Sequence, residues 1–288
     1  MFNSIEELVI QANQRKCPLW QVMLTQEAEV AERSEADIMA EMASNYQVMK
    51  EAIQAGIRGV TTHSGMCGMD AKRLYDYLKK GSVLTDETLL KAACYAIATN
   101  EVNAAMGRIC ATPTAGSSGV LPGVMLAMQE KFALPDEAIV HHLFTAGAIG
   151  LVIANRASIS GAAGGCQAEI GSASAMAAAA VTELSGGTPE QSAHAMALAL
   201  KNMLGLACDP LAGLVEVPCI KRNAAGAANA ILTAELALAG IESKVPWDEV
   251  IYAMHQIGRG MPATFKETAQ GGLATTPTGE AWKRLLWS

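Results

Sequence analysis

Cysteine is the residue type with the greatest potential for chemistry in this 288-residue chain, which contains seven of them. Cys166, Cys208 and Cys219 each lie in a turn-rich segment, at separations of 42 and 11 residues. Three thiolates could bind a metal, but no two cysteines are spaced as CxxC, so the common zinc-ribbon and bacterial ferredoxin patterns are absent. Spacing alone therefore favours ordinary buried thiols over a metal site.

The other four cysteines give weaker signals. Cys94 lies in an apolar helical stretch, which indicates a core thiol, and Cys67 shares a loop with His63. Cys17 and Cys110 lie near the ends of predicted elements and suggest no role.

His63 is the best candidate for acid–base chemistry among the five histidines. The others, His141, His142, His194 and His255, fall in predicted helices, where a packed or surface role is more common. His63 lies beside Ser64 in a polar loop flanked by glycine, where a side chain is free to act as an acid or base. A structural role for His63 remains equally open.

Two glycine-rich loops could bind a small anion. Thr114–Gly119 precedes a predicted helix, whose first N–H groups could hold a carboxylate. It lacks the lysine of a nucleotide P-loop, and Ser158–Gly165 lacks GxGxxG, so each loop could equally be a packing turn. There is no GxSxG motif, and no lysine is marked out for pyridoxal phosphate.

The elements that position these residues are expected to be helices. Aromatic residues make up only 5% of the chain while 51% is apolar, so small and aliphatic side chains supply the core. Ser34 is expected to cap a helix over 35–53, Thr85 to start another, and Thr188 with Pro189 and Gln191 to start a third. A helix of small residues is predicted over 167–184. No linker or repeat divides the chain, which predicts a single all-α domain over residues 1–288.

Charge and apolar length limit the classes of partner. The net charge of −7 argues against nucleic acid or an anionic membrane as the main partner. The longest apolar run, Phe144–Ala154, is too short to span a bilayer and is expected to be a buried helix. The odd number of cysteines and the absence of a leader-like start predict reduced thiols in a cytoplasmic protein.

Four longer segments carry a resemblance to a known family. They are Ala98–Gly107, Ala111–Gly119, Ala157–Ser174 and Leu204–Asn223. Together they resemble the iron–sulfur L-serine dehydratase family, specifically the α-subunit of its two-chain form, from about residue 5 to Gly279. Motifs of this length are far more specific than a lone glycine signature.

The resemblance implies an all-helical fold and the conversion of L-serine to pyruvate and ammonia, in amino-acid degradation and gluconeogenesis. It implies a [4Fe-4S] cluster held by Cys166, Cys208 and Cys219, and a heterodimer with an L-serine dehydratase β-subunit. Because three thiolates leave one iron open, that iron could act as a Lewis acid on the substrate hydroxyl. Relatives can cap this iron with a terminal cysteine, whereas this chain ends Leu285–Ser288 without one.

Further roles follow as expectations. Lys221 and Arg222, directly after Cys219, could bind the substrate carboxylate. His63 or a residue of the β-subunit could be the base. The remaining candidates for orienting the amino acid are Thr112, Thr114, Ser117 and Ser118. An L-cysteine desulfidase-type lyase on the same scaffold and a non-catalytic iron–sulfur sensor remain alternatives.

Overall fold

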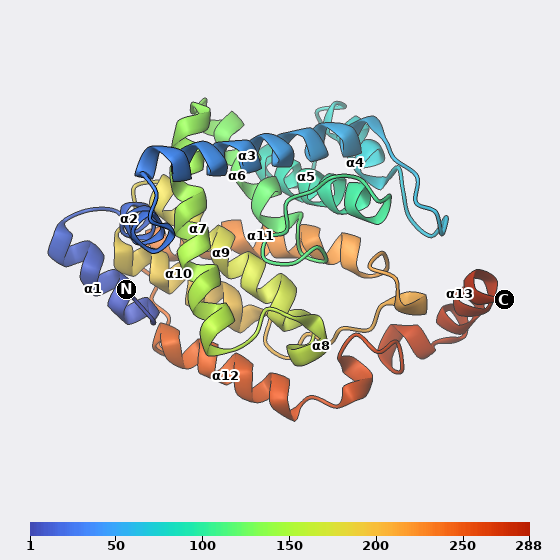
Figure 1. The fold of residues 1–288 in the computed structure, drawn as a ribbon. Helices are drawn as coiled ribbons and strands as arrows, with labels where there is room; N and C mark the ends of the chain where they lie inside the picture. The colour runs from blue at the N-terminus through green and yellow to red at the C-terminus, as the bar shows by residue number, and fades with distance from the viewer.

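The fold is built almost wholly of α-helices, which confirms the all-α prediction. The computed structural model describes residues 1–288 and contains no β-strand, only isolated bridges between Thr61 and Gly68 and between Cys208 and Lys266. The thirteen helices, drawn in Figure 1, are α1 (Ile5–Arg15), α2 (Leu19–Ala31), α3 (Glu35–Arg58), α4 (Asp70–Leu78), α5 (Glu87–Ala104), α6 (Val120–Phe132), α7 (Asp136–Arg156), α8 (Gly161–Gly164), α9 (Ser172–Leu184), α10 (Pro189–Asn202), α11 (Cys219–Leu238), α12 (Trp247–Gly260) and α13 (Pro277–Trp287). Shorter helical turns are η1 (Gln167–Gly171), η2 (Leu211–Gly213), η3 (Ala263–Phe265) and η4 (Gly272–Thr275).

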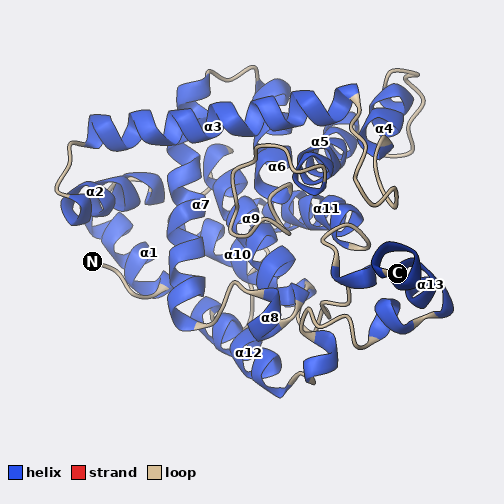
Figure 2. Cartoon of the chain, turned by 45° about the vertical axis from the view of Figure 1, so that its right-hand side comes forward, coloured by secondary structure: helices blue, strands red, loops and turns tan.

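Helix α9 lies at the centre of the molecule (Figure 2). It packs against α6, α7, α10 and α11, and every residue from Ser172 to Glu183 is buried. Alanine and serine dominate this stretch, and small side chains let neighbouring helix axes approach closely. The small-residue helix that the sequence predicts is therefore the core of the fold.

Glycines bring two further helices into direct contact with the backbone of α5. A Cβ atom on Gly119, at the start of α6, would lie 2.0 Å from the carbonyl oxygen of Ala96. A Cβ atom on Gly56, near the end of α3, would lie 2.3 Å from the carbonyl oxygen of Ala98. Neither contact is possible for a larger residue, so these two positions fix how closely α3, α5 and α6 pack.

Two helices begin where the sequence predicts. Ser34 caps α3, and its Oγ accepts a hydrogen bond of 3.1 Å from the Asp37 amide. Thr188 and Gln191 form a reciprocal capping box at α10, with Pro189 in the first turn. At both helix N-termini a side-chain oxygen accepts from a free N–H group of the first turn. Because these contacts are local, the sequence alone predicts where both helices begin.

Two other predicted features differ from the structure. Asp86, not Thr85, caps α5, because its carboxylate accepts from the Thr88 amide at 2.9 Å and suits the positive end of the helix. The predicted helix over 167–184 divides into the π-helical turn η1 and α9. The wider turn lies directly after Cys166, where long-range contacts described below hold the chain.

Helix α7 is the one element long and apolar enough to cross a membrane by length and composition. It has 21 residues and a mean hydropathy of 1.6, but 61% of the apolar stretch is buried inside the molecule. It packs against α2, α3 and α9. These contacts agree with the expectation that Phe144–Ala154 forms a buried core helix.

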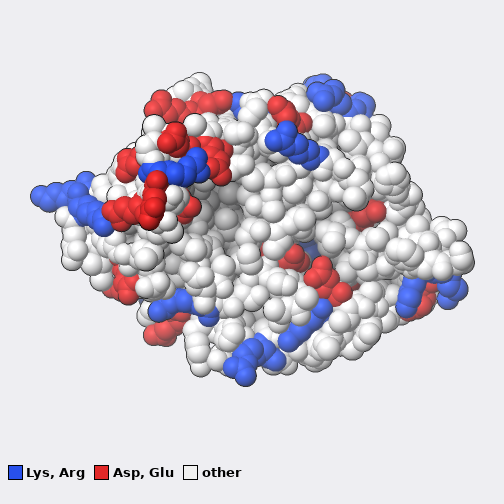
Figure 3. All heavy atoms as spheres, viewed as in Figure 1, with Lys and Arg blue, Asp and Glu red and all other residues white.

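The chain after α12 forms an arm along one side of the molecule. Figure 1 shows this arm running from the lower edge to α13 at the right-hand edge, where α13 packs on η2 and η4. The indole Nε1 of Trp287 donates to the Ala212 carbonyl at 3.1 Å. On the face drawn in Figure 3, acidic and basic side chains form small mixed groups with largely uncharged surface between them.

Candidate metal centre

Three buried cysteines converge from three separate segments. Cys166 precedes η1, Cys208 lies in the loop after α10, and Cys219 is the first residue of α11. They are 2%, 3% and 7% exposed and form no disulfide. Burial raises the pKa of the Cys166 thiol to about 11. Burial also raises the pKa of Cys208 and Cys219, and the charge of Cys166 raises both further, so the sulfur atoms lie within electrostatic reach.

The side chain of Gln167 ties the Cys166 turn to the segment that leads into Cys208. Its Oε1 accepts from the Gly205 amide at 2.9 Å, and its Nε2 donates to the Gly164 carbonyl at 2.9 Å. The Gln167 amide also donates to the Leu206 carbonyl at 3.0 Å. Gln167 is fully buried and uses both ends of its amide, so it holds two distant loops at a fixed separation.

The Cys208 loop is held by the C-terminal arm. The Cys208 amide donates to the Phe265 carbonyl at 2.8 Å, and its carbonyl accepts from the Glu267 amide at 3.0 Å. Next to it, Asp209 accepts from the Leu273 amide at 2.9 Å. The arm therefore completes one wall of the cysteine site.

Arg222 joins the same loop to α11. Its guanidinium donates to the Ala207 carbonyl at 2.7 Å and pairs with Asp209 at 3.0 Å. The charge of Arg222 also lowers the pKa of Cys166, against the larger effect of burial. The predicted carboxylate-binding arginine thus lies beside the cysteines, with part of its hydrogen-bonding capacity already used.

Glu169 is the residue of this site that the sequence reasoning missed. One carboxylate oxygen of Glu169, the Cys208 sulfur and one carboxylate oxygen of Glu267 lie within 4.8 Å of one another, which is a possible metal-binding group. Burial raises the pKa of Glu169, and a hydrogen bond of 2.6 Å from Thr114 Oγ1 opposes that rise. The available signal was that Glu169 is the sole charged residue between Ala157 and Thr182.

The predicted Thr/Ser loop divides into one residue that faces the site and three that hold the loop. Thr114 reaches Glu169. Thr112 donates to the Ser118 carbonyl at 3.3 Å, Ser117 to the Thr112 carbonyl at 3.3 Å, and Ser118 to the Ala115 carbonyl at 2.8 Å.

Two asparagines that the sequence reasoning did not select reinforce this loop. The side-chain amides of Asn100 and Asn223 both donate to the Gly116 carbonyl, at 3.2 and 2.8 Å. Both asparagines are fully buried. They fasten the loop to α5 and α11 and so fix the backbone from which Thr114 projects.

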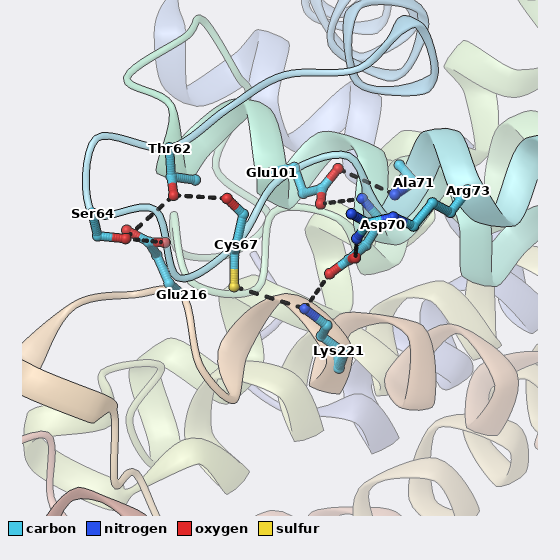
Figure 4. A network of polar contacts seen from close by, with 9 residues as sticks. All are labelled: Thr62, Ser64, Cys67, Asp70, Ala71, Arg73, Glu101, Glu216 and Lys221. Atoms are coloured by element: carbon cyan, nitrogen blue, oxygen red, sulfur yellow. Dashed lines mark hydrogen bonds and ion pairs between the residues drawn. The ribbon is translucent and has the colours of Figure 1, made fainter. Parts of the chain in front are cut away.

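The loop that carries His63 is fastened above the start of α11 (Figure 4). Ser64 Oγ donates to Glu216 at 2.8 Å, three residues before Cys219. Lys221 pairs with Asp70 and lies 3.7 Å from the sulfur of Cys67. His63 itself is exposed and makes no hydrogen bond to the chain, and Lys221 is committed to Asp70.

Glu101 supports the same region from α5. Its carboxylate accepts from the amides of Asp70 and Ala71 at 2.8 and 3.2 Å, so it serves as the anionic cap of α4 (Figure 4). Burial raises the pKa of Glu101, and the two amide bonds oppose this effect. The position of Asp70, and through it that of Lys221, depends on this buried carboxylate.

A separate hollow of about 250 Å³ lies behind the Cys166 turn, between α8 and α12. His255 and Arg259 line it together with Gln167. None of the three predicted cysteine ligands lines it, so it borders the cysteine site only through the Cys166 turn and Gln167.

The comparisons with known proteins agree on one family. The sequence model described as serine dehydratase alpha chain matches residues 14–274. The chain is 56% identical over 287 residues to the probable L-serine dehydratase alpha chain of Bacillus subtilis (strain 168), covering 100% of this chain and 96% of that protein. It is 43% identical over 286 residues to the L-serine dehydratase alpha chain of Peptoniphilus asaccharolyticus, covering 99% and 98%. The L-serine dehydratase TdcG of Escherichia coli (strain K12) is 40% identical over 257 residues, which is 85% of this chain but 56% of that protein.

Proposed function

The chain belongs to the serine dehydratase alpha chain family, and from this premise we propose that it is the catalytic subunit of an L-serine ammonia-lyase. The proposed reaction converts L-serine into pyruvate and ammonia. The observation that carries the proposal is that Cys166, Cys208 and Cys219 are buried, free and within electrostatic reach of one another, with the half-buried Glu169 beside Cys208.

The donor set fits the proposed [4Fe-4S] cluster. Soft thiolates are the ligands that iron–sulfur clusters use, and three free thiols lie here within electrostatic reach of one another. Burial raises the pKa of all three, so a cationic group is needed to hold them together as thiolates. Arg222 beside Cys166 contributes part of that positive charge.

When bound, a cluster with three protein ligands supplies a Lewis-acidic iron for the hydroxyl of the substrate. The chain's own residues then bind and orient the amino acid. Donors of Arg222 not used by Asp209 are proposed to bind the carboxylate, and Lys221 can join only by leaving Asp70. Thr114 orients the carboxylate of Glu169 by donating a hydrogen bond to it.

His63 is the proposed base for the α-proton, with a β-subunit residue as the alternative. Its loop is pinned by Ser64 and Glu216 while its imidazole stays exposed and unpaired, so the ring nitrogen is available to accept a proton. Loss of the α-proton and of hydroxide yields aminoacrylate, which tautomerises and is hydrolysed in water to pyruvate and ammonia.

We also propose that the chain is one catalytic domain over residues 1–288, acts in the cytoplasm and pairs with an L-serine dehydratase β-subunit. The alpha-chain names of its relatives support a partner, and the TdcG protein extends well beyond the matched region. Anaerobic co-purification with the β-subunit, followed by iron and sulfide counting, tests this. A chain that is fully active without any partner would contradict it.

A pair of cysteine variants tests the ligand assignment. Cys208→Ser should abolish both the cluster absorbance and pyruvate formation, because a hydroxyl is a poor ligand for iron in such clusters. Cys94→Ser is the matched control, since Cys94 is equally buried but its thiol donates only to the Ala71 carbonyl. Normal cluster content and activity in Cys208→Ser would refute the assignment.

The choice of substrate is tested with the anaerobically prepared complex. Pyruvate release from L-serine is compared with sulfide release from L-cysteine, which differs in its leaving group. Faster turnover of cysteine would favour the desulfidase alternative. An air-stable cluster with no turnover of either amino acid would instead favour a sensor.

A further inference from the structure

We propose that Glu169 binds the ammonium group of the amino-acid substrate, an inference that rests on the proposed lyase function. Glu169 projects from η1, one turn after Cys166, and its carboxylate lies in the group with Cys208 and Glu267. An amino acid reacting at the cysteine site must place its ammonium group within a few ångströms of its hydroxyl. The Glu169 carboxylate occupies such a position.

The carboxylate of Glu169 has an unsatisfied side. Thr114 donates to its Oε1, but no hydrogen bond from the chain reaches Oε2 and no lysine or arginine pairs with it. An unpaired carboxylate that is partly removed from water is costly unless a cation approaches it. The charge of Glu267 nearby makes the local potential more negative. Of the charged groups of serine, only the ammonium suits this environment.

Two glycines pack directly against this carboxylate. A Cβ atom on Gly161 would lie 2.6 Å from Glu169 Oε2 and 3.2 Å from the Cys208 sulfur. A Cβ atom on Gly116 would lie 3.1 Å from Oε1. A side chain at either position would press on the carboxylate of Glu169. The backbone at Gly161 and Gly116 therefore lies close to Glu169, and no side chain from these two positions covers it.

The assignment also explains why the Glu169 carboxylate is held in one fixed orientation by its hydrogen bond from Thr114. Thr114 comes from a loop that Asn100 and Asn223 fix from opposite helices. A rigid acceptor binds an ammonium with less loss of freedom than a mobile one, and charge-assisted hydrogen bonds are strongly directional. Glu267 is exposed and should contribute less, because water screens its charge.

The test compares two ligands that differ only at the group in question. L-alanine and L-lactate lack the hydroxyl that would leave, and differ by an ammonium in place of a hydroxyl. Their affinities are measured by anaerobic calorimetry on the loaded complex with its partner chain. Glu169→Gln, which keeps the size and the bond from Thr114, should weaken L-alanine binding by about 10- to 100-fold and leave L-lactate unchanged. Glu267→Gln should weaken it less than about fivefold.

An unchanged alanine-to-lactate ratio in Glu169→Gln would overturn the proposal. So would loss of iron from a variant that still folds, because Glu169 would then serve the cluster and not the substrate. If Glu169→Gln does not fold, Thr114→Val decides the question, since it removes the bond that orients Glu169, together with a contact to the Ser117 hydroxyl, and should still reduce the ratio. Failure of the wild-type complex to release pyruvate from serine would refute the lyase function instead, which distinguishes the two failures.

Discussion

At the scale of single residues, the molecule contains buried carboxylates that do structural work far from the cysteines. Glu183, at the end of α9, accepts from the Leu19 amide at 2.5 Å and from the hydroxyl of Thr145. Burial raises its pKa above the usual 4.5, and the hydrogen bonds only partly oppose this. Glu183 thus joins α2 and α7 to the central helix, while its charge is disfavoured.

This carboxylate predicts a pH dependence of stability. Because the folded-state pKa is raised, the folded protein holds an extra proton between pH 4.5 and that higher value, so stability falls as the pH rises through this window. Glu183→Gln removes the charge; its oxygen can still accept from the Leu19 amide, while its NH2 group can donate to the Thr145 hydroxyl, which reverses that bond. Its melting temperature should therefore rise relative to wild type between pH 4.5 and 7.5, by roughly 3 °C for each unit of pKa shift.

Glu183→Ala is the control, because it leaves the Leu19 amide without a partner. It should lower stability by about 2 kcal/mol at pH 4.5 and by less at pH 7.5, because it too removes the carboxylate whose charge is disfavoured. A constant difference in melting temperature between Glu183→Gln and wild type across this range would contradict the raised pKa.

At the scale of helices, close packing depends on single glycines, which place no side chain between two helix backbones. Gly119→Ala would place a methyl group against the Ala96 carbonyl, and we expect it to cost about 2 kcal/mol or more. Gly147→Ala is the matched control in α7, where an added Cβ meets nothing within 4 Å, so helix propensity should raise stability by about 0.5–1 kcal/mol. Melting temperatures of the two variants should move in opposite directions, and equal shifts would refute the packing argument.

Helical elements were also the part of the structure most accessible from sequence. Ser34 and Thr188 mark helix starts through contacts within four residues, and such local chemistry is readable without a fold. The division of the 167–184 segment into η1 and α9 could not be predicted from the local sequence, because Gln167 bonds to Gly205, 38 residues away. Glu169 was missed for the same reason, since Thr114 and Glu267 approach it only in the folded chain. The resemblance selected the cysteines, and their ligand role remains a prediction.

At the scale of the whole molecule, the cysteine site joins three segments that lie far apart in the sequence. A cluster bound by Cys166, Cys208 and Cys219 would cross-link η1, the loop after α10 and α11. A ligand that binds only the folded state raises its stability by mass action. Removing iron with a chelator under anaerobic conditions should therefore lower the melting temperature by about 8 °C or more.

The variant Cys208→Ser provides the control for this measurement. It should melt at the same temperature before and after chelation, because it has no cluster to lose. A wild-type protein whose melting temperature is unaffected by loss of iron would show that the three cysteines do not hold the group in the native fold.

The C-terminal arm also sets the order in which the site can form during synthesis. All three cysteines have been made once residue 219 is added, but the backbone of Cys208 is bonded on both sides by residues 265 and 267. Asp209, the partner of Arg222, likewise waits for Leu273. A ribosome-bound chain therefore carries the thiols before it can build their enclosure, so the mature surroundings of Cys208 arise only after residues 265 to 273 have been added.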